Sequence, residues 1–97
     1  MIDVEIKYLS MIKSILSQHV PEYQVWVFGS RVTGKASVYS DLDLVLIGNK
    51  KLDRCCMEEL KSAFSESDVP FKVDVADWHD MPDWLQKAIL EQYEVLQ

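Results

Sequence analysis

The spacing of hydrophobic residues predicts three amphipathic helices along the chain. In each of them apolar side chains recur every three or four positions, which places them on one side of a helix. The expected helices span Ile2–Val20, Leu52–Phe64 and a stretch from Pro82 to Tyr93, with proline at a helix start, where it is tolerated. The apolar side of the last helix is expected to carry Trp84, Leu85, Ala88, Ile89 and Tyr93. Such helices require an apolar layer to pack against.

Three shorter apolar stretches predict that this layer is a β-sheet. Gln24–Phe28 is β-branched and aromatic, Leu42–Ile47 is almost continuously apolar, and Phe71–Trp78 alternates between apolar and polar residues. A short helix and a loop are expected in residues 31–39. The resulting order, αβ(α)βαβα, predicts an α/β (α+β) fold: a small mixed sheet of three or more strands with helices packed mainly on one face.

Composition and charge limit the kinds of protein that this chain can be. Its 97 residues suit a single domain, residues 1–97. The formal net charge of −6 at pH 7 argues against nucleic acid as a partner, because such binding depends mainly on clustered Lys and Arg. No apolar run has the length of a membrane span, and Asp3 and Glu5 are unlike the basic start of a secretion signal. We therefore expect a cytoplasmic protein that does not bind a membrane.

Two acidic residues at the start of the second strand are the first candidates for chemistry. Asp41 and Asp43 are two positions apart, so their side chains should project to the same face of the strand. Like charges held side by side destabilise a fold unless a proton or a cation lies between them. Mg²⁺ suits this position because it prefers carboxylate oxygens and keeps positions open for substrate phosphates. Two solvated acids at a strand end are the alternative interpretation.

The turn after the first strand is suited to binding phosphate. Gly29 lets the backbone approach a ligand closely, Ser30 adds a hydroxyl donor, and a short helix after them would direct free N–H groups outward. Arg31 and Lys35 follow, and each is a candidate either for contact with a phosphate or for an ordinary charge pair.

A third carboxylate strengthens the case for a reactive site. Asp74 lies between two valines of the third strand, and we expect it to reach the same end of the sheet as Asp41 and Asp43. Three carboxylates around two cations about 4 Å apart stabilise the attacking and leaving oxygens of an in-line displacement at phosphorus. Asp74 would also be placed to accept the proton of the incoming hydroxyl. Asp77 competes for this role, but it lies three positions further and should point to the opposite face.

This pattern resembles that of a known family. Gly29-Ser30, ten further residues, Asp41-x-Asp43 and a later Asp74 in an apolar strand look like the motif of the DNA polymerase β-like nucleotidyltransferase superfamily. The short chain is similar to the minimal nucleotidyltransferase (MNT) branch over nearly its whole length. The resemblance implies that Gly29 and Ser30 hold the β- and γ-phosphates of a nucleotide. It also implies that Asp41 and Asp43 bind metal, with Asp74 as the third carboxylate.

The resemblance also implies a function and a partner. Minimal members are commonly paired with a small all-helical HEPN protein in a toxin–antitoxin system. The implied activity is Mg²⁺-dependent transfer of AMP from ATP to a tyrosine of the HEPN toxin, in a hetero-oligomer in which this chain is the antitoxin and two Mg²⁺ ions take part. Two alternatives stay open: a non-catalytic antitoxin that neutralises its partner by complex formation, and adenylylation of a small molecule with a second subunit. The family's larger members add a helical domain that this sequence lacks, so the acceptor is expected to come from outside the chain.

Overall fold

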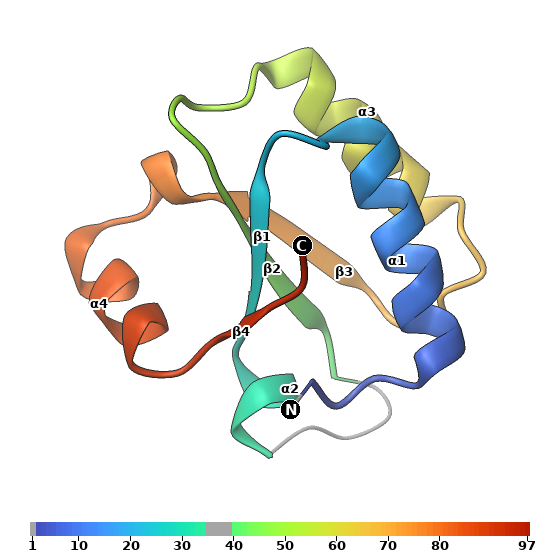
Figure 1. Ribbon diagram of the computed structural model, residues 1–97, viewed down its shortest axis with the longest axis horizontal. Helices are drawn as coiled ribbons and strands as arrows, with labels where there is room; N and C mark the ends of the chain where they lie inside the picture. Colours follow the sequence, from blue (N-terminus) through green and yellow to red (C-terminus); the bar gives the residue numbers. More distant parts are fainter. Residues whose placement is uncertain (1, 35–39) are drawn as a thin grey trace.

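The structure, a computed structural model, describes residues 2–34 and 40–97 as a mixed α/β fold (Figure 1). In chain order its elements are α1 (Ile6–His19), β1 (Gln24–Phe28), α2 (Ser30–Thr33), β2 (Leu42–Ile47), α3 (Arg54–Ser65), β3 (Val73–Asp77), the 3₁₀ turn η1 (Trp78–Asp80), α4 (Asp83–Glu91) and β4 (Glu94–Val95). The predicted fold class and order of elements are confirmed.

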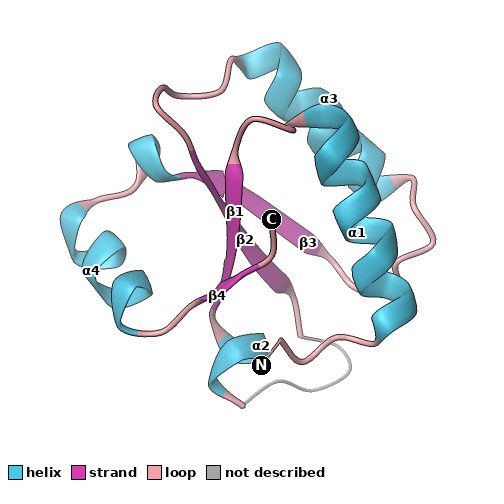
Figure 2. Ribbon diagram, in the orientation of Figure 1, coloured by secondary structure: helices cyan, strands magenta, loops and turns pink. Residues whose placement is uncertain are grey.

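The four strands of the described chain form one sheet in the order β3-β2-β1-β4 (Figure 2). β1 is antiparallel to both of its neighbours, β2 and β4, whereas β2 and β3 are parallel. The apolar strands β1 and β2 therefore lie inside the sheet, and the two strands that carry more polar residues form its edges. The sequence pattern did not predict β4, because two residues are too few to show a period.

The main core lies between one face of the sheet and the helices α1 and α3, which run side by side in Figure 1. The strand residues of this face are paired across β1 and β2: Val25 with Leu46, and Val27 with Leu44. The buried residues of the two helices are Ile12 and Leu16 of α1 and Leu60 and Phe64 of α3. The expectation that helices pack mainly on one face is confirmed.

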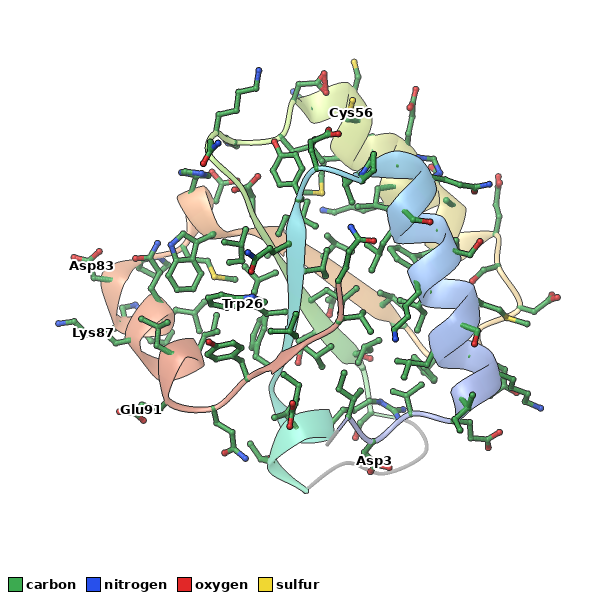
Figure 3. All side chains as sticks on the ribbon, in the orientation of Figure 1. Asp3, Trp26, Cys56, Asp83, Lys87 and Glu91 are labelled. Carbon is green, nitrogen blue, oxygen red and sulfur yellow. The ribbon has the colours of Figure 1, made fainter. Side chains whose placement is uncertain are left out.

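The opposite face of the sheet is covered by aromatic side chains and α4. Trp26 of β1 stacks on Tyr93, with ring centroids 4.1 Å apart, and meets the edge of Trp78 at 5.7 Å. Figure 3 shows Trp26 between β1 and α4, and Asp83 and Lys87 on the outer side of α4. Phe28 and Asp43 are paired at one end of this same face, and both are half-buried.

Two helix ends and the exposure of one side chain differ from the prediction. α1 begins at Ile6 instead of Ile2, because the backbone of Asp3 exchanges hydrogen bonds with Arg31 and is not free for a helix. Tyr93 lies beyond α4, where it stacks on Trp26 instead of lining the helix. Trp84 was predicted on the apolar side of this helix, but it is 70% exposed.

In the described part of the chain, no helix has the length and apolar character needed to cross a membrane.

Candidate active site

The turn after β1 is formed by a glycine that no other residue replaces easily. Gly29 has φ +82° and ψ −156°, a conformation that is essentially restricted to glycine. Its carbonyl accepts hydrogen bonds from Val32 N at 3.0 Å and Thr33 N at 3.1 Å, which starts α2. A Cβ atom on Gly29 would lie 2.5 Å from Oδ2 of Asp43. The turn and the carboxylate are therefore packed directly against each other.

The sheet register brings Asp43 and Asp74 together. Asp43 is paired with Phe28 on β1 and with Asp74 on β3, so the three side chains form a row across the same face. Asp41 lies one residue before β2 and is exposed, whereas Asp43 is half-buried. The expectation that Asp74 and Asp43 share a face is met by this register.

The charges of these residues interact. Partial burial raises the pKa of Asp43 above its ordinary value of 3.8, and the negative charges of Asp74 and Asp41 raise it further. All three carboxylates thus contribute to one electrostatic site. Desolvation is the largest cause, because Asp43 lies against Gly29 and the sheet.

The donor set fits a hard divalent cation, although the carboxylates do not form a finished ligand cluster. Within residues 2–34 and 40–97, no group of three or more His, Cys, Asp or Glu side chains is arranged to hold a metal ion. Asp74 Oδ1 instead lies 3.4 Å from Nζ of Lys72. After desolvation, the negative charges of Asp74 and Asp41 are the further causes of the raised pKa of Asp43. Oxygen donors with excess negative charge are what Mg²⁺ binds.

Asp77 has a structural task on the other face. Its side chain is 2% exposed, and its two carboxylate oxygens accept hydrogen bonds from Leu52 N at 2.8 Å and His79 N at 2.9 Å. These bonds hold the segment before α3 and begin η1. Asp77 therefore ties two loops to the end of β3, and the preference for Asp74 as the third carboxylate agrees with this geometry.

We expect Asp77→Ala to lower the free energy of unfolding by about 2–4 kcal/mol, because two part-buried N–H groups lose a charged acceptor that is itself buried. Asp74→Asn serves as the control. Its side chain is 46% exposed, and we expect a change of less than about 1 kcal/mol. Urea denaturation followed by circular dichroism measures both values. An Asp77→Ala variant as stable as the parent protein would contradict this structural role.

Arg31 lies in the interior, which differs from the predicted contact with phosphate. The residue is 6% exposed, and its guanidinium donates hydrogen bonds to the carbonyl oxygens of Ser40 and Asp3. A guanidinium already bonded to backbone carbonyls is poorly placed to neutralise a phosphate. Lys35, the other candidate, lies outside the described residues.

Sequence reasoning missed two residues near the site, Phe71 and Lys72. The Phe71 ring lies 4.2 Å from Cζ of Arg31, and Lys72 pairs with Asp74. The alternating pattern placed both in the third strand without a role in the site, and in the structure both stand just before β3. Only the sheet register places them beside the carboxylates.

A cavity adjoins each end of the row of carboxylates. One of about 400 Å³ lies between the Gly29 turn and α4, and one of about 590 Å³ includes Asp74. The first is lined by Phe28, Gly29, Thr33, Leu85, Ala88, Ile89, Glu91 and Gln92. The second runs between the end of α3 and β3 and includes Lys61 and Lys72. The first cavity therefore adjoins the Gly29 turn, and the second adjoins Asp74.

The chain belongs to the polymerase beta nucleotidyltransferase family. Residues 10–97 match the sequence model of the family described as "Polymerase beta, Nucleotidyltransferase". The chain is also 47% identical over 96 residues to "Probable protein adenylyltransferase MntA" of Haemophilus influenzae (strain ATCC 51907 / DSM 11121 / KW20 / Rd), which covers 99% of this chain and 84% of that protein. The predicted nucleotidyltransferase class is confirmed.

Solved structures with the same fold come from toxin–antitoxin complexes. A toxin–antitoxin structure with AMP-PNP matches with a TM-score of 0.77 at 23% identity, over 92% of this chain and 72% of that chain. A tri-AMPylated Shewanella oneidensis HEPN toxin in complex with an MNT antitoxin matches with a TM-score of 0.68 at 23% identity, over 92% of this chain and 68% of that chain. At these identities the likeness establishes the fold.

Proposed function

We propose that this protein transfers AMP from ATP to a tyrosine hydroxyl of a HEPN-type toxin and acts as its antitoxin, in the cytoplasm. The observation that carries the proposal is the row formed by Asp43 and Asp74 against the Gly29 turn. It is supported by the 47% identity to a probable protein adenylyltransferase. Structures of similar fold that contain AMP-PNP, or a HEPN toxin carrying AMP, support the nucleotide and the acceptor.

The reaction assigns a separate task to each part of the site. The acceptor oxygen forms a bond to the α-phosphorus of ATP, the bond from that phosphorus to the bridging oxygen breaks, and pyrophosphate leaves. Gly29 and Ser30 hold the β- and γ-phosphates, and Asp74 accepts the proton of the tyrosine hydroxyl. Asp41, Asp43 and Asp74 would hold two Mg²⁺ ions. These ions would neutralise the negative charge of the phosphates and of the departing pyrophosphate.

The cavity of about 400 Å³ beside Gly29 is the space that we assign to the nucleoside of ATP. Its floor is apolar, formed by Phe28, Leu85 and Ile89, which suits the faces of a base. Glu91 at its rim disfavours a phosphate there, because like charges repel. The triphosphate is then directed from this cavity toward the turn and the carboxylates.

Filling this cavity is expected to weaken ATP binding. Ala88 is an exposed residue of α4 that lines the cavity, and Ala88→Phe should raise the KM for ATP by about 10-fold with a smaller change in kcat, because ground-state binding is lost. Lys87→Phe is the matched control, since Lys87 is an exposed residue of the same helix and does not line the cavity. An unchanged KM in Ala88→Phe, measured with the toxin as acceptor, would place the nucleoside elsewhere.

The exposed apolar residues provide surface for a protein partner. Trp84 is 70% exposed, Leu90 54% and Val95 58%, and all three belong to α4 or the edge strand β4. Ile6 of α1, which is 82% exposed, is a further large apolar side chain on the surface, and such side chains are available for contact with a partner chain. This observation also favours the second candidate function, an antitoxin that neutralises its partner by binding without catalysis.

One experiment separates catalysis from binding. The protein is incubated with Mg²⁺, its HEPN partner and each of the four α-labelled ribonucleoside triphosphates, and the labelled product is analysed by mass spectrometry. We expect label from ATP on a tyrosine of the toxin, and no label when magnesium is chelated. A toxin that is neutralised without acquiring any label would contradict the enzymatic function and support binding alone. Label on a small molecule instead of the toxin would also overturn it.

A further inference from the structure

We propose that Arg31 is a positioning residue that fastens the two carboxylate-bearing strands to the phosphate-binding turn. It does so without contacting the nucleotide. This inference rests on the proposed function, since it assigns a role within the same site. It differs from both roles that the sequence left open for Arg31, contact with a phosphate and an ordinary charge pair.

The first connection runs from Arg31 to the residue before Asp41. Nε and Nη2 of Arg31 both donate to the carbonyl oxygen of Ser40, at 3.1 Å and 2.8 Å. Ser40 is bonded directly to Asp41, so this two-pronged contact restrains the backbone on which that carboxylate is mounted. Arg31 itself is the second residue of α2, which begins directly after Gly29.

The second connection runs to the segment before β3. The guanidinium lies over the ring of Phe71, with Cζ 4.2 Å from the ring centroid. Phe71 stands three residues before Asp74. Between them, Lys72 O accepts a hydrogen bond from Leu42 N at 2.9 Å, which joins the start of β2 to the start of β3. Arg31 therefore lies next to both chain segments at the point where they enter the sheet.

The third connection ties the N-terminal segment into the same cluster. Nη1 of Arg31 donates to Asp3 O at 2.7 Å, and Asp3 N donates to Arg31 O at 2.8 Å. Figure 3 shows Asp3 beside α2. The first bond covers one nitrogen of the guanidinium and the second joins the two backbones, and Arg31 is only 6% exposed.

The cluster requires arginine because of the shape of its guanidinium. A planar fork donates to two carbonyl oxygens in different directions while its face stacks on an aromatic ring. Lysine carries the same charge on a single nitrogen and reproduces neither the fork nor the stacking. A residue that only neutralised phosphate charge would tolerate that exchange far better. The two roles therefore predict different results for Arg31→Lys.

The test compares Arg31→Lys and Phe71→Leu with Arg54→Lys. Arg54 is the other arginine of the sequence, and its side chain is 92% exposed, so its replacement is a matched control. Steady-state AMP transfer to the HEPN partner is measured at varied ATP, well below the melting temperature of each variant. We expect Arg31→Lys to lower kcat by roughly 10- to 100-fold and to change the KM for ATP by less than about threefold. Phe71→Leu should lower kcat in the same direction, and Arg54→Lys should leave both unchanged.

A second measurement does not depend on transfer. Hydrogen exchange of the Leu42 amide, which is bonded to Lys72 O, is followed by NMR in the protein without nucleotide. We expect exchange to be at least about 10-fold faster in Arg31→Lys than in Arg54→Lys, because the start of β2 opens more often. Equal exchange rates would overturn the positioning role. A higher KM for ATP with an unchanged kcat in Arg31→Lys would overturn it in favour of phosphate contact.

Failure of the positioning role of Arg31 can be distinguished from failure of the proposed function. If the unaltered protein transfers no AMP, the proposed function is wrong, and the exchange rates still decide whether Arg31 holds the start of β2. If it transfers AMP and Arg31→Lys is unaffected in both measurements, only the role of Arg31 is wrong.

Discussion

Replacing Asp43 with asparagine is expected to reduce AMP transfer by roughly 1,000-fold, because charge stabilisation of several kcal/mol is lost in the transition state. Asparagine keeps the shape of the side chain but removes its charge, so the metal that neutralises the phosphates loses a carboxylate ligand. Transfer is measured with α-labelled ATP and the HEPN partner. Asp68→Asn, an exposed loop position, is the control. Retained transfer in the double variant Asp41→Asn with Asp43→Asn would show that these carboxylates are not part of the reaction.

The single variant Asp43→Asn is expected to have a higher free energy of unfolding than the parent protein at neutral pH when a chelator is present. The folded chain raises the pKa of Asp43, which means that its charged form is disfavoured by folding. The parent therefore gains stability as pH falls through this raised pKa, and Asp43→Asn does not. The difference should be largest near pH 7 and should vanish below the ordinary carboxyl value of 3.8. Denaturation at a series of pH values measures it.

Gly29→Ala should lower both the rate of AMP transfer and the free energy of unfolding. The conformation of Gly29, φ +82° and ψ −156°, costs other residues of order 1–3 kcal/mol, and the new Cβ would overlap Oδ2 of Asp43. Either the turn opens or the carboxylate moves, and both displace the site. We expect a loss of about 2–4 kcal/mol of folding free energy and at least about 100-fold of kcat/KM.

Gly34→Ala is the matched control for this prediction. Gly34 has φ +83° and ψ 10°, and a Cβ there would meet no atom of the described residues within 4 Å. The substitution should cost about 1 kcal/mol for the left-handed backbone and leave transfer near the parent value. Equal effects of the two substitutions would indicate backbone strain alone, without the contact to Asp43.

Much of the fold followed from local patterns. β1 and β2 were predicted with the observed boundaries, because each is a continuous apolar or β-branched run that ends at glycine. The helices were located correctly but their ends were not, since capping depends on particular contacts. Asp53 accepts a hydrogen bond from Cys56 N at 2.8 Å and starts α3 two residues after the predicted Leu52.

The residues of the candidate site also differ in how far local sequence patterns identified them. Gly29, Ser30, Asp41 and Asp43 were recognisable because their function depends on short spacing within one turn and one strand, and such spacing is written directly in the sequence. Asp74 was preferred over Asp77 because it lies between two valines inside the strand, whereas Asp77 lies next to Trp78 at the strand exit, and the register of β3 against β2 agrees with that choice. The roles of these residues in transfer await the variants described above.

Arg31 shows what local spacing does not determine. The sequence by itself determined the strands, the amphipathic helices and the motif residues, because periodicity and spacing are properties of neighbouring positions. Only the tertiary structure decided that Arg31 is buried, that Asp3 and Ser40 accept its hydrogen bonds, and that Phe71 stacks on it. These partners lie 9 to 40 positions away along the chain, and an arginine has the same identity whether it faces solvent, phosphate or backbone carbonyls. Its environment, and with it its role, is set by the packing of distant segments.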